Sequence, residues 1–169
     1  EEPSSRPLMA WLSDTAQENS LVLPDVPSAS LSPRVFARSL IASLSPQPDT
    51  PLDSQALSVG FNLRALKLAA SQVRERLSPE NWNLIERVEA EFARDCAAMA
   101  ADAEYGTAEA LAALQGASEL LSAITGAQTD RMTRDHGWRF LTVGRLIERL
   151  IGMSSQLDAF VDTGALRHA

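Results

Sequence analysis

Apolar residues recur at alternating spacings of four and three through most of this chain, and that period constrains its fold more than any other feature. Within residues 54–77 the pattern passes through Val59, Leu63, Leu66, Ala70, Val73 and Leu77. Residues spaced in this way lie along one side of an α-helix and form a continuous apolar stripe. The segment is therefore predicted to be an amphipathic helix whose stripe faces a core.

Three further segments repeat this pattern, and the first two of them have helix boundary signals. One starts at Ser78-Pro79-Glu80, where Ser78 caps and Pro79 opens the helix, and it ends at Tyr105-Gly106. Another starts at the cap residue Thr107 and ends near Gly126, and the last covers about 135–162. Their predicted inward residues are Ile85, Val88, Phe92, Cys96, Met99 and Ala103; Leu111, Leu114, Leu121 and Ile124; and Phe140, Val143, Ile147, Leu150, Leu157 and Val161.

Proline and serine interrupt the first third of the chain and leave room only for short helices, at Pro7–Glu18 and Pro33–Leu44. The predicted fold is all-α: a helical bundle of four long, mostly antiparallel helices plus one or two short N-terminal helices. We expect a single domain over 1–169, irregular with short helices over 1–53 and a bundle over 54–162.

Charge and composition narrow the class of protein. The 169 residues carry a net charge of −7, which argues against a nucleic-acid binder because such proteins need a basic face. No apolar run approaches a membrane span, and the polar, acidic start resembles no signal peptide. Since the chain also lacks an initiator Met, we expect a cytoplasmic piece excised from a larger bacterial protein, with no membrane or nucleic-acid partner.

Metal and nucleophile motifs are weak. The two histidines, His136 and His168, do not follow a Glu at the spacing that di-metal bundles use, so no metal site is predicted. The single cysteine, Cys96, falls on an apolar helix face, where thiols are usually inert core residues. No cofactor is predicted either.

The last helical segment holds the candidate anion- or ligand-binding cluster, which consists of Arg139, Arg145, Glu148 and Arg149. Arg145, Glu148 and Arg149 share the polar face, and Arg145 and Glu148 are three residues apart, so they can pair in solvent. The cluster is therefore either a structural set of ion pairs or a site for an anionic substrate with Glu148 as a base. No catalytic residue is assigned.

Arg139 differs because its direction falls among the apolar residues Leu146, Leu150 and Leu157. A buried guanidinium needs a partner, and it either fixes helix register or holds an anion. Candidate partners are Glu89, Asp95 and Glu119.

Arg64, Lys67 and Arg74 form a basic line on the first long helix of this acidic chain. Such a line is either a solvated face or a candidate partner-binding surface for an acidic protein.

The run from Met132 to Arg149, with Gly137-Trp138-Arg139-Phe140-Leu141 and Gly144-Arg145-Leu146-Ile147-Glu148-Arg149, resembles the signature of the bacterial Alpha-E family. The junction from Arg74 to Trp82 resembles a second family feature. The family's Ala-Arg-x-Asn-Ala-Arg run is replaced by residues 66–71, Leu-Lys-Leu-Ala-Ala-Ser, and its first Gly-Arg-x-x-Glu-Arg-like helix has no copy here. The chain is thus expected to be the C-terminal part of such a domain.

The resemblance implies a partner more than a reaction, because Alpha-E domains occur beside circularly permuted ATP-grasp ligases and transglutaminase-like proteins. The expected function is a non-catalytic module that docks such a peptide ligase or holds its substrate. Two alternatives stay open. One is a self-association module that forms a homo-oligomer, and the other is an enzyme or binder that acts on an anionic or peptidic substrate through the Arg/Glu cluster.

Overall fold

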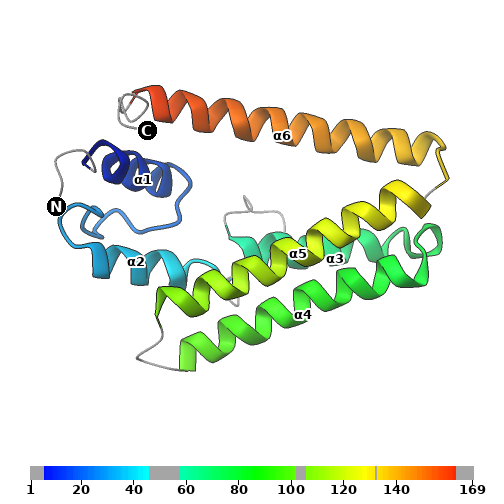
Figure 1. Cartoon of the computed structure of the whole chain (residues 1–169), viewed down its shortest axis with the longest axis horizontal. Coiled ribbons are helices and arrows are strands. Elements are labelled where there is room, and N and C mark those ends of the chain that lie inside the picture. Colours follow the sequence, from blue (N-terminus) through cyan, green and yellow to red (C-terminus); the bar gives the residue numbers. More distant parts are fainter. Residues whose placement is uncertain (1–5, 46–57, 102–105, 132, 163–169) are drawn as a thin grey trace. The chain divides into compact units, whose positions relative to one another are not determined.

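The computed structural model describes residues 6–45, 58–101, 106–131 and 133–162, and every element in these ranges is helical (Figure 1). The predicted all-α class is confirmed. The elements are α1 (Arg6–Glu18), α2 (Pro33–Ala42), α3 (Val59–Ser71), the short 3-10 helix η2 (Arg74–Arg76), α4 (Pro79–Ala101), α5 (Thr107–Arg131) and α6 (His136–Asp162). None of the described helices is long and apolar enough to cross a lipid bilayer.

The chain divides into two compact units, and the division differs from the predicted bundle over 54–162. One unit is residues 41–132, and the other joins residues 1–40 to residues 133–169. Three of the four long helices that were expected to pack together, α3, α4 and α5, lie in the first of these units. The fourth, α6, groups with the first 40 residues instead.

Within residues 41–132, α3, α4 and α5 run alternately up and down, and α4 packs against both of the others (Figure 1). The α4 stripe is confirmed at all five described positions: Ile85, Val88, Phe92, Cys96 and Met99 are buried. Ala103 lies outside the described residues. Ser78 caps α4 as predicted, since its Oγ accepts a hydrogen bond from the backbone N–H of Asn81 at 3.2 Å.

The first predicted helix, over 54–77, ends earlier than its apolar period suggested. Helix α3 stops at Ser71, and Val73 at the expected stripe position is exposed. Beyond it the chain tightens into η2, where the Arg74 guanidinium lies 5.1 Å from the Trp82 ring centroid. This local turn chemistry stops a helix that the apolar spacing alone would continue.

For α5 the predicted face is only partly right. Ile124 is buried and Leu114 packs half-buried against the core, whereas Leu111 and Leu121 are exposed. The other buried residues of α5 are Ala110, Ala113, Ala117, Leu120 and Gln128. Small alanines let α5 approach the large side chains of α4 closely, so packing selected a face that hydrophobicity did not. The helix also continues through Gly126, its predicted end, to Arg131.

The unit that contains α1 has a small core of Ala16, Val22, Ala29 and Phe36. Buried Ser13 ties it together, because its Oγ donates to the Met9 carbonyl and accepts from the Ala29 N–H, each at 2.9 Å. On the other segment of this unit, Phe160 of α6 meets Trp11 of α1 edge to face, with ring centroids 5.2 Å apart.

The prediction that the α6 stripe faces inward is wrong. Phe140, Val143, Ile147, Leu150, Leu157 and Val161 are each more than half exposed, and Phe140 reaches 78%. The half-buried residues of α6 lie on another side of the helix, at Trp138, Leu141, Thr142, Arg145, Ala159 and Phe160. An apolar period specifies which residues share a face, but it cannot specify that another element covers that face.

Candidate functional site

Helix α6 carries the motif residues, and its start is well defined. The Asp135 carboxylate accepts a hydrogen bond from the Trp138 N–H at 3.0 Å, which is an N-cap contact. The Arg134 guanidinium lies 5.6 Å from the Trp138 ring centroid. Both contacts lie at the start of the helix, which begins at His136.

The four residues of the predicted cluster do not converge. Arg139 lies about 120° around the helix from Arg145, at 100° per residue. It is exposed rather than buried, as are Glu148 and Arg149, whereas Arg145 is half-buried and already engaged in an interaction. Because the apolar stripe around Arg139 is itself exposed, its guanidinium needs none of the predicted carboxylate partners.

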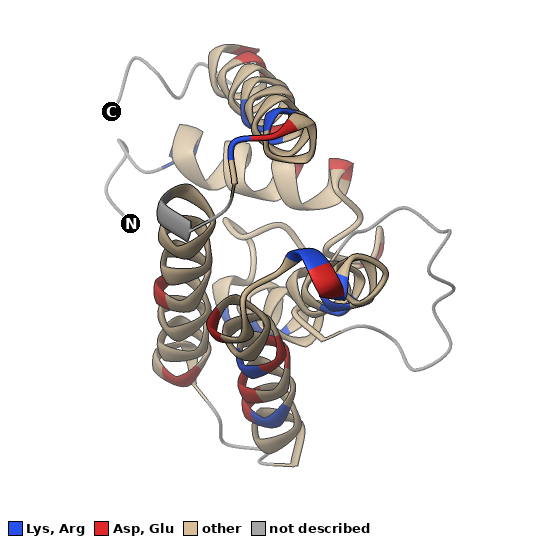
Figure 2. Cartoon of the chain, turned by 90° about the vertical axis from the view of Figure 1, so that its right-hand side faces the viewer, with Lys and Arg blue, Asp and Glu red and all other residues tan. Residues whose placement is uncertain are grey.

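The predicted pairing of Arg145 with Glu148 also fails. Within the described part of the chain, neither Glu148 nor Arg149 makes a hydrogen bond or ion pair. Acidic and basic residues lie close together on some helices, whereas other helical stretches carry acidic residues alone (Figure 2). Glu148 and Arg149 therefore form an exposed, unengaged pair of opposite charges.

The basic line on α3 is brought into internal contacts. The Lys67 ammonium lies 2.8 Å from the Glu89 carboxylate of α4, with side chains 38% and 21% exposed. Arg64 lies over the Phe61 ring at 5.6 Å, and Arg74 lies over Trp82. A partner that bound here would have to compete with these contacts.

The remaining candidate groups have structural surroundings. Cys96 is buried, and this desolvation raises the pKa of its thiol, with a further rise from the neighbouring Asp95 carboxylate. Among the described residues no group of three or more His, Cys, Asp or Glu side chains could hold a metal ion. His136 is exposed, and His168 lies outside the described residues.

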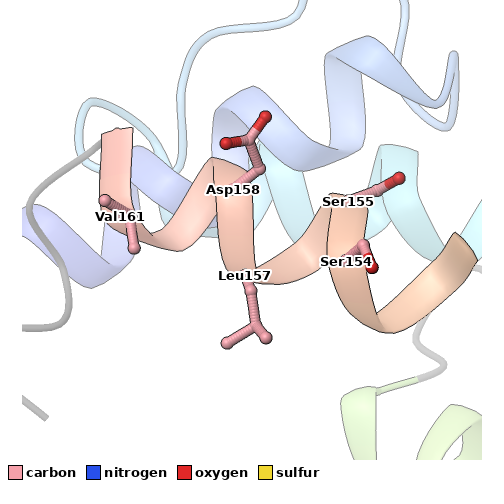
Figure 3. A pocket seen from close by; sticks show the side chains of 5 residues that line it. All are labelled: Ser154, Ser155, Leu157, Asp158 and Val161. Carbon is pink, nitrogen blue, oxygen red and sulfur yellow. The ribbon is translucent and has the colours of Figure 1, made fainter. Parts of the chain in front are cut away.

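A shallow concavity lies along the C-terminal half of α6, and Figure 3 shows its lining: Ser154, Ser155, Leu157, Asp158 and Val161. All five residues come from one helix. Leu157 and Val161 point to one side, and Asp158 and Ser155 point away from them (Figure 3). The charged motif at Glu148-Arg149 is not part of this lining.

Sequence reasoning missed two features. The tetrapeptide Leu-Ile-Glu-Arg occurs twice, at residues 84–87 of α4 and at 146–149 of α6, and a search for short repeats would have found it. The second feature is Asn81, which is 1% exposed in the first turn of α4, with neither side-chain polar atom bonded within the described residues. No sequence signal marks that burial.

Comparison with known proteins identifies the family of this chain. Residues 33–168 match a family described as a predicted alpha-helical domain with a conserved ER motif. The chain belongs to the Alpha-E family. Glu-Arg pairs occur here at residues 75–76, 86–87 and 148–149, and the last lies in the run that carries the Alpha-E resemblance.

The curated relatives of this Alpha-E chain are much longer than the chain itself. An uncharacterised protein of Mycobacterium tuberculosis strain H37Rv is 31% identical over 134 residues, which cover 78% of this chain and 14% of the relative. An uncharacterised protein of Mycobacterium bovis has the same identity and coverage. No solved structure matches the chain.

Proposed function

We propose that this Alpha-E chain is a non-catalytic helical module that docks onto an ATP-grasp-type peptide ligase or holds the peptidic substrate of that ligase. The observation that carries the proposal is the state of Glu148 and Arg149, which are exposed and unengaged within the described residues. Lys67 and Glu89, by contrast, are engaged with each other between α3 and α4. An exposed pair of opposite charges is suited to matching charges on another protein.

The family context supports a role beside other domains. The resemblance to Alpha-E domains implies a place beside ATP-grasp ligases or transglutaminase-like proteins. The chain also spans only 14% of the length of its curated relatives. A module of this kind would use a surface motif to position a neighbouring catalytic domain or its acidic or peptidic substrate.

Geometry favours docking over catalysis by the Arg/Glu cluster. A site for an anion needs donors that converge on one position, and a general base must reach the proton that it removes. Arg139 points about 120° away from Arg145, and the Glu148 carboxylate is exposed. This arrangement supports a contact surface more readily than an enclosed active site.

The test measures binding of this chain to a purified ATP-grasp-type peptide ligase. Glu148→Lys combined with Arg149→Glu reverses both charges and should weaken binding by about tenfold or more, since charge pairs across interfaces contribute this much. The matched control is Glu86→Lys with Arg87→Glu, because the same tetrapeptide surrounds that pair on α4 and both residues are exposed. The control should bind like the wild type.

No binding by the wild-type chain, together with ligase activity that is unchanged in its absence, would remove the proposal. Equal losses in the two charge-reversed variants would show that the effect is not specific to the α6 motif, because neither variant changes the net charge. A parallel measurement with a transglutaminase-like protein distinguishes the two partner classes.

A further inference from the structure

We propose that the exposed apolar face of α6 pairs with the same face of a second copy of this chain, with the two helices antiparallel. This face, called the α6 seam below, consists of Phe140, Val143, Ile147, Leu150, Ser154, Leu157 and Val161. These positions follow an unbroken alternation of three and four, which is the heptad period of helices that pair along their length.

The amount of uncovered apolar surface is sufficient for a dimer. Nine large apolar side chains of α6 are each more than half exposed: Phe140, Val143, Leu146, Ile147, Leu150, Ile151, Met153, Leu157 and Val161. At roughly 100 Å² for a whole side chain, they present on the order of 500 Å² of apolar area. A standard interface buries about 800 Å² on each partner, of which about 60% is apolar, so the two areas agree.

The α6 seam is complementary to itself in the antiparallel direction. In an antiparallel pair, a residue at heptad position a of one helix meets a residue at position d of the other. Because residue numbers rise in opposite directions on the two helices, the numbers of two residues that meet add to a constant. The sum 297 pairs Phe140 with Leu157, Ile147 with Leu150, and Val143 with the small Ser154. Every core position between 140 and 157 then meets an apolar partner except Val143, which faces the hydroxyl of Ser154.

Charge favours the same direction. The N-terminal end of the seam is bordered by Arg139, and the C-terminal end by Asp158, both of which are exposed. With the sum of 297, Arg139 of one copy lies at the same level as Asp158 of the other but at the opposite edge of the seam, so the attraction is between oppositely charged helix ends and not a direct ion pair. Antiparallel helices also bring the positive end of one helix dipole to the negative end of the next. A parallel pair would instead place like charges and like dipole ends together.

The first measurement is the mass of the whole 169-residue chain by sedimentation equilibrium. We expect twice the chain mass of 18.3 kDa at micromolar concentration. Ile147→Asp with Leu150→Asp should raise the dissociation constant at least about 100-fold, because it places charges at the centre of the interface. Leu111→Asp is the matched control, since Leu111 is an equally exposed leucine of α5, and it should leave the mass unchanged.

The direction is tested by cross-linking on a Cys96→Ala background. Chains with Phe140→Cys and chains with Leu157→Cys should link to each other through a short bis-maleimide when mixed, but neither should link to itself. Two copies of position 140 are about 25 Å apart in an antiparallel pair, at 1.5 Å per residue. Self-linking of each variant would overturn the antiparallel arrangement.

A chain that stays monomeric at about 100 μM would overturn the proposal. Labelling of a Phe140→Cys chain then identifies what takes the place of a second copy. A protected thiol in the monomer means that the chain covers its own seam. A reactive thiol means that the seam awaits a different protein. Neither measurement involves the ligase, so failure here is separate from failure of the docking function.

Discussion

Residues 84–87 of α4 and residues 146–149 of α6 have the same sequence, Leu-Ile-Glu-Arg, yet their surroundings are opposite. In α4 the isoleucine, Ile85, is 1% exposed and is packed in the core with α3 and α5. In α6 the equivalent Ile147 is 52% exposed. Both segments are fully helical, so the tetrapeptide specifies its own conformation and leaves its burial to whatever packs against it.

The two helices also differ in how their flanking positions continue the stripe. Moving 62 residues along from α4 to α6 places Ser154 at the position of Phe92 and Asp158 at the position of Cys96. A serine and an aspartate at these positions would destabilise a core that several helices surround, because their polar side chains would be buried there. They are tolerated on a face that meets one partner, which is consistent with the antiparallel pairing proposed for α6.

The largest expected effect is the difference in the free energy of unfolding between substitutions at Ile85 and at Ile147. Ile85→Asp places an unpaired carboxylate in the core and should cost on the order of 4 kcal/mol or more in the free energy of unfolding. Ile147→Asp should change it by about 0.5 kcal/mol or less in dilute solution. Urea unfolding followed by circular dichroism measures both, and equal losses would mean that α6 is buried within the monomer.

The next comparison uses two phenylalanines. Phe92→Ala removes a side chain that is 2% exposed and should cost about 3–5 kcal/mol. Phe140→Ala removes one that is 78% exposed, so it should be nearly neutral in the same dilute urea titration. A large loss for Phe140→Ala would contradict the contrast between the helices.

The third comparison replaces a residue of α4 by the residue found at the corresponding position of α6. Asn81 of α4 corresponds to Val143 of α6. Asn81→Val removes two buried polar atoms that have no partner within the described residues, so it should raise the free energy of unfolding by about 1 kcal/mol. Thermal unfolding measures the change. A loss of stability instead would show that the carboxamide has a partner such as a buried water.

The N-caps of α4 and α6 should contribute equally to stability, although the apolar stripes of the two helices differ in burial. Ser78→Ala removes the cap of α4, and Asp135→Ala removes that of α6, and each should cost about 1 kcal/mol. The contribution is local, so it does not depend on whether the apolar face is covered. Amide hydrogen exchange in the first turn of each helix is the measurement, and a clear difference between the two would show that capping depends on packing here.

The smallest expected effect is the pH dependence of the free energy of unfolding that Cys96 of α4 contributes. The corresponding residue of α6 is Asp158. Burial raises the pKa of the Cys96 thiol, so below the unfolded-state pKa, about 8.5, the thiol is protonated in both states. Above that pH the unfolded thiol ionises first, and the free energy of unfolding falls until the folded pKa is reached. Wild type and Cys96→Val should therefore diverge as the pH rises above about 8.5 in urea titrations, and parallel curves would contradict the assignment.

The sequence by itself determined the helices, the cap of α4 and which residues share the α4 stripe. Ser78-Pro79 signals the start of α4 through local hydrogen bonding, and the spacing of the stripe placed five residues on one face, because both depend only on neighbours within a few residues along the chain. The predicted cap Thr107 is instead the first residue of α5, and the Asp135 cap of α6 came from the structure. The Alpha-E membership also followed from local runs around Glu148-Arg149.

Only the tertiary structure decided which stripes are covered. It buried the alanines of α5 instead of Leu111 and Leu121, because the fit against α4 depends on shape across the interface. It grouped α6 with residues 1–40, left the α6 seam exposed, and spread Arg139, Arg145 and Glu148 around one helix. Burial is a property of two surfaces at once, and a periodic sequence describes only one of them.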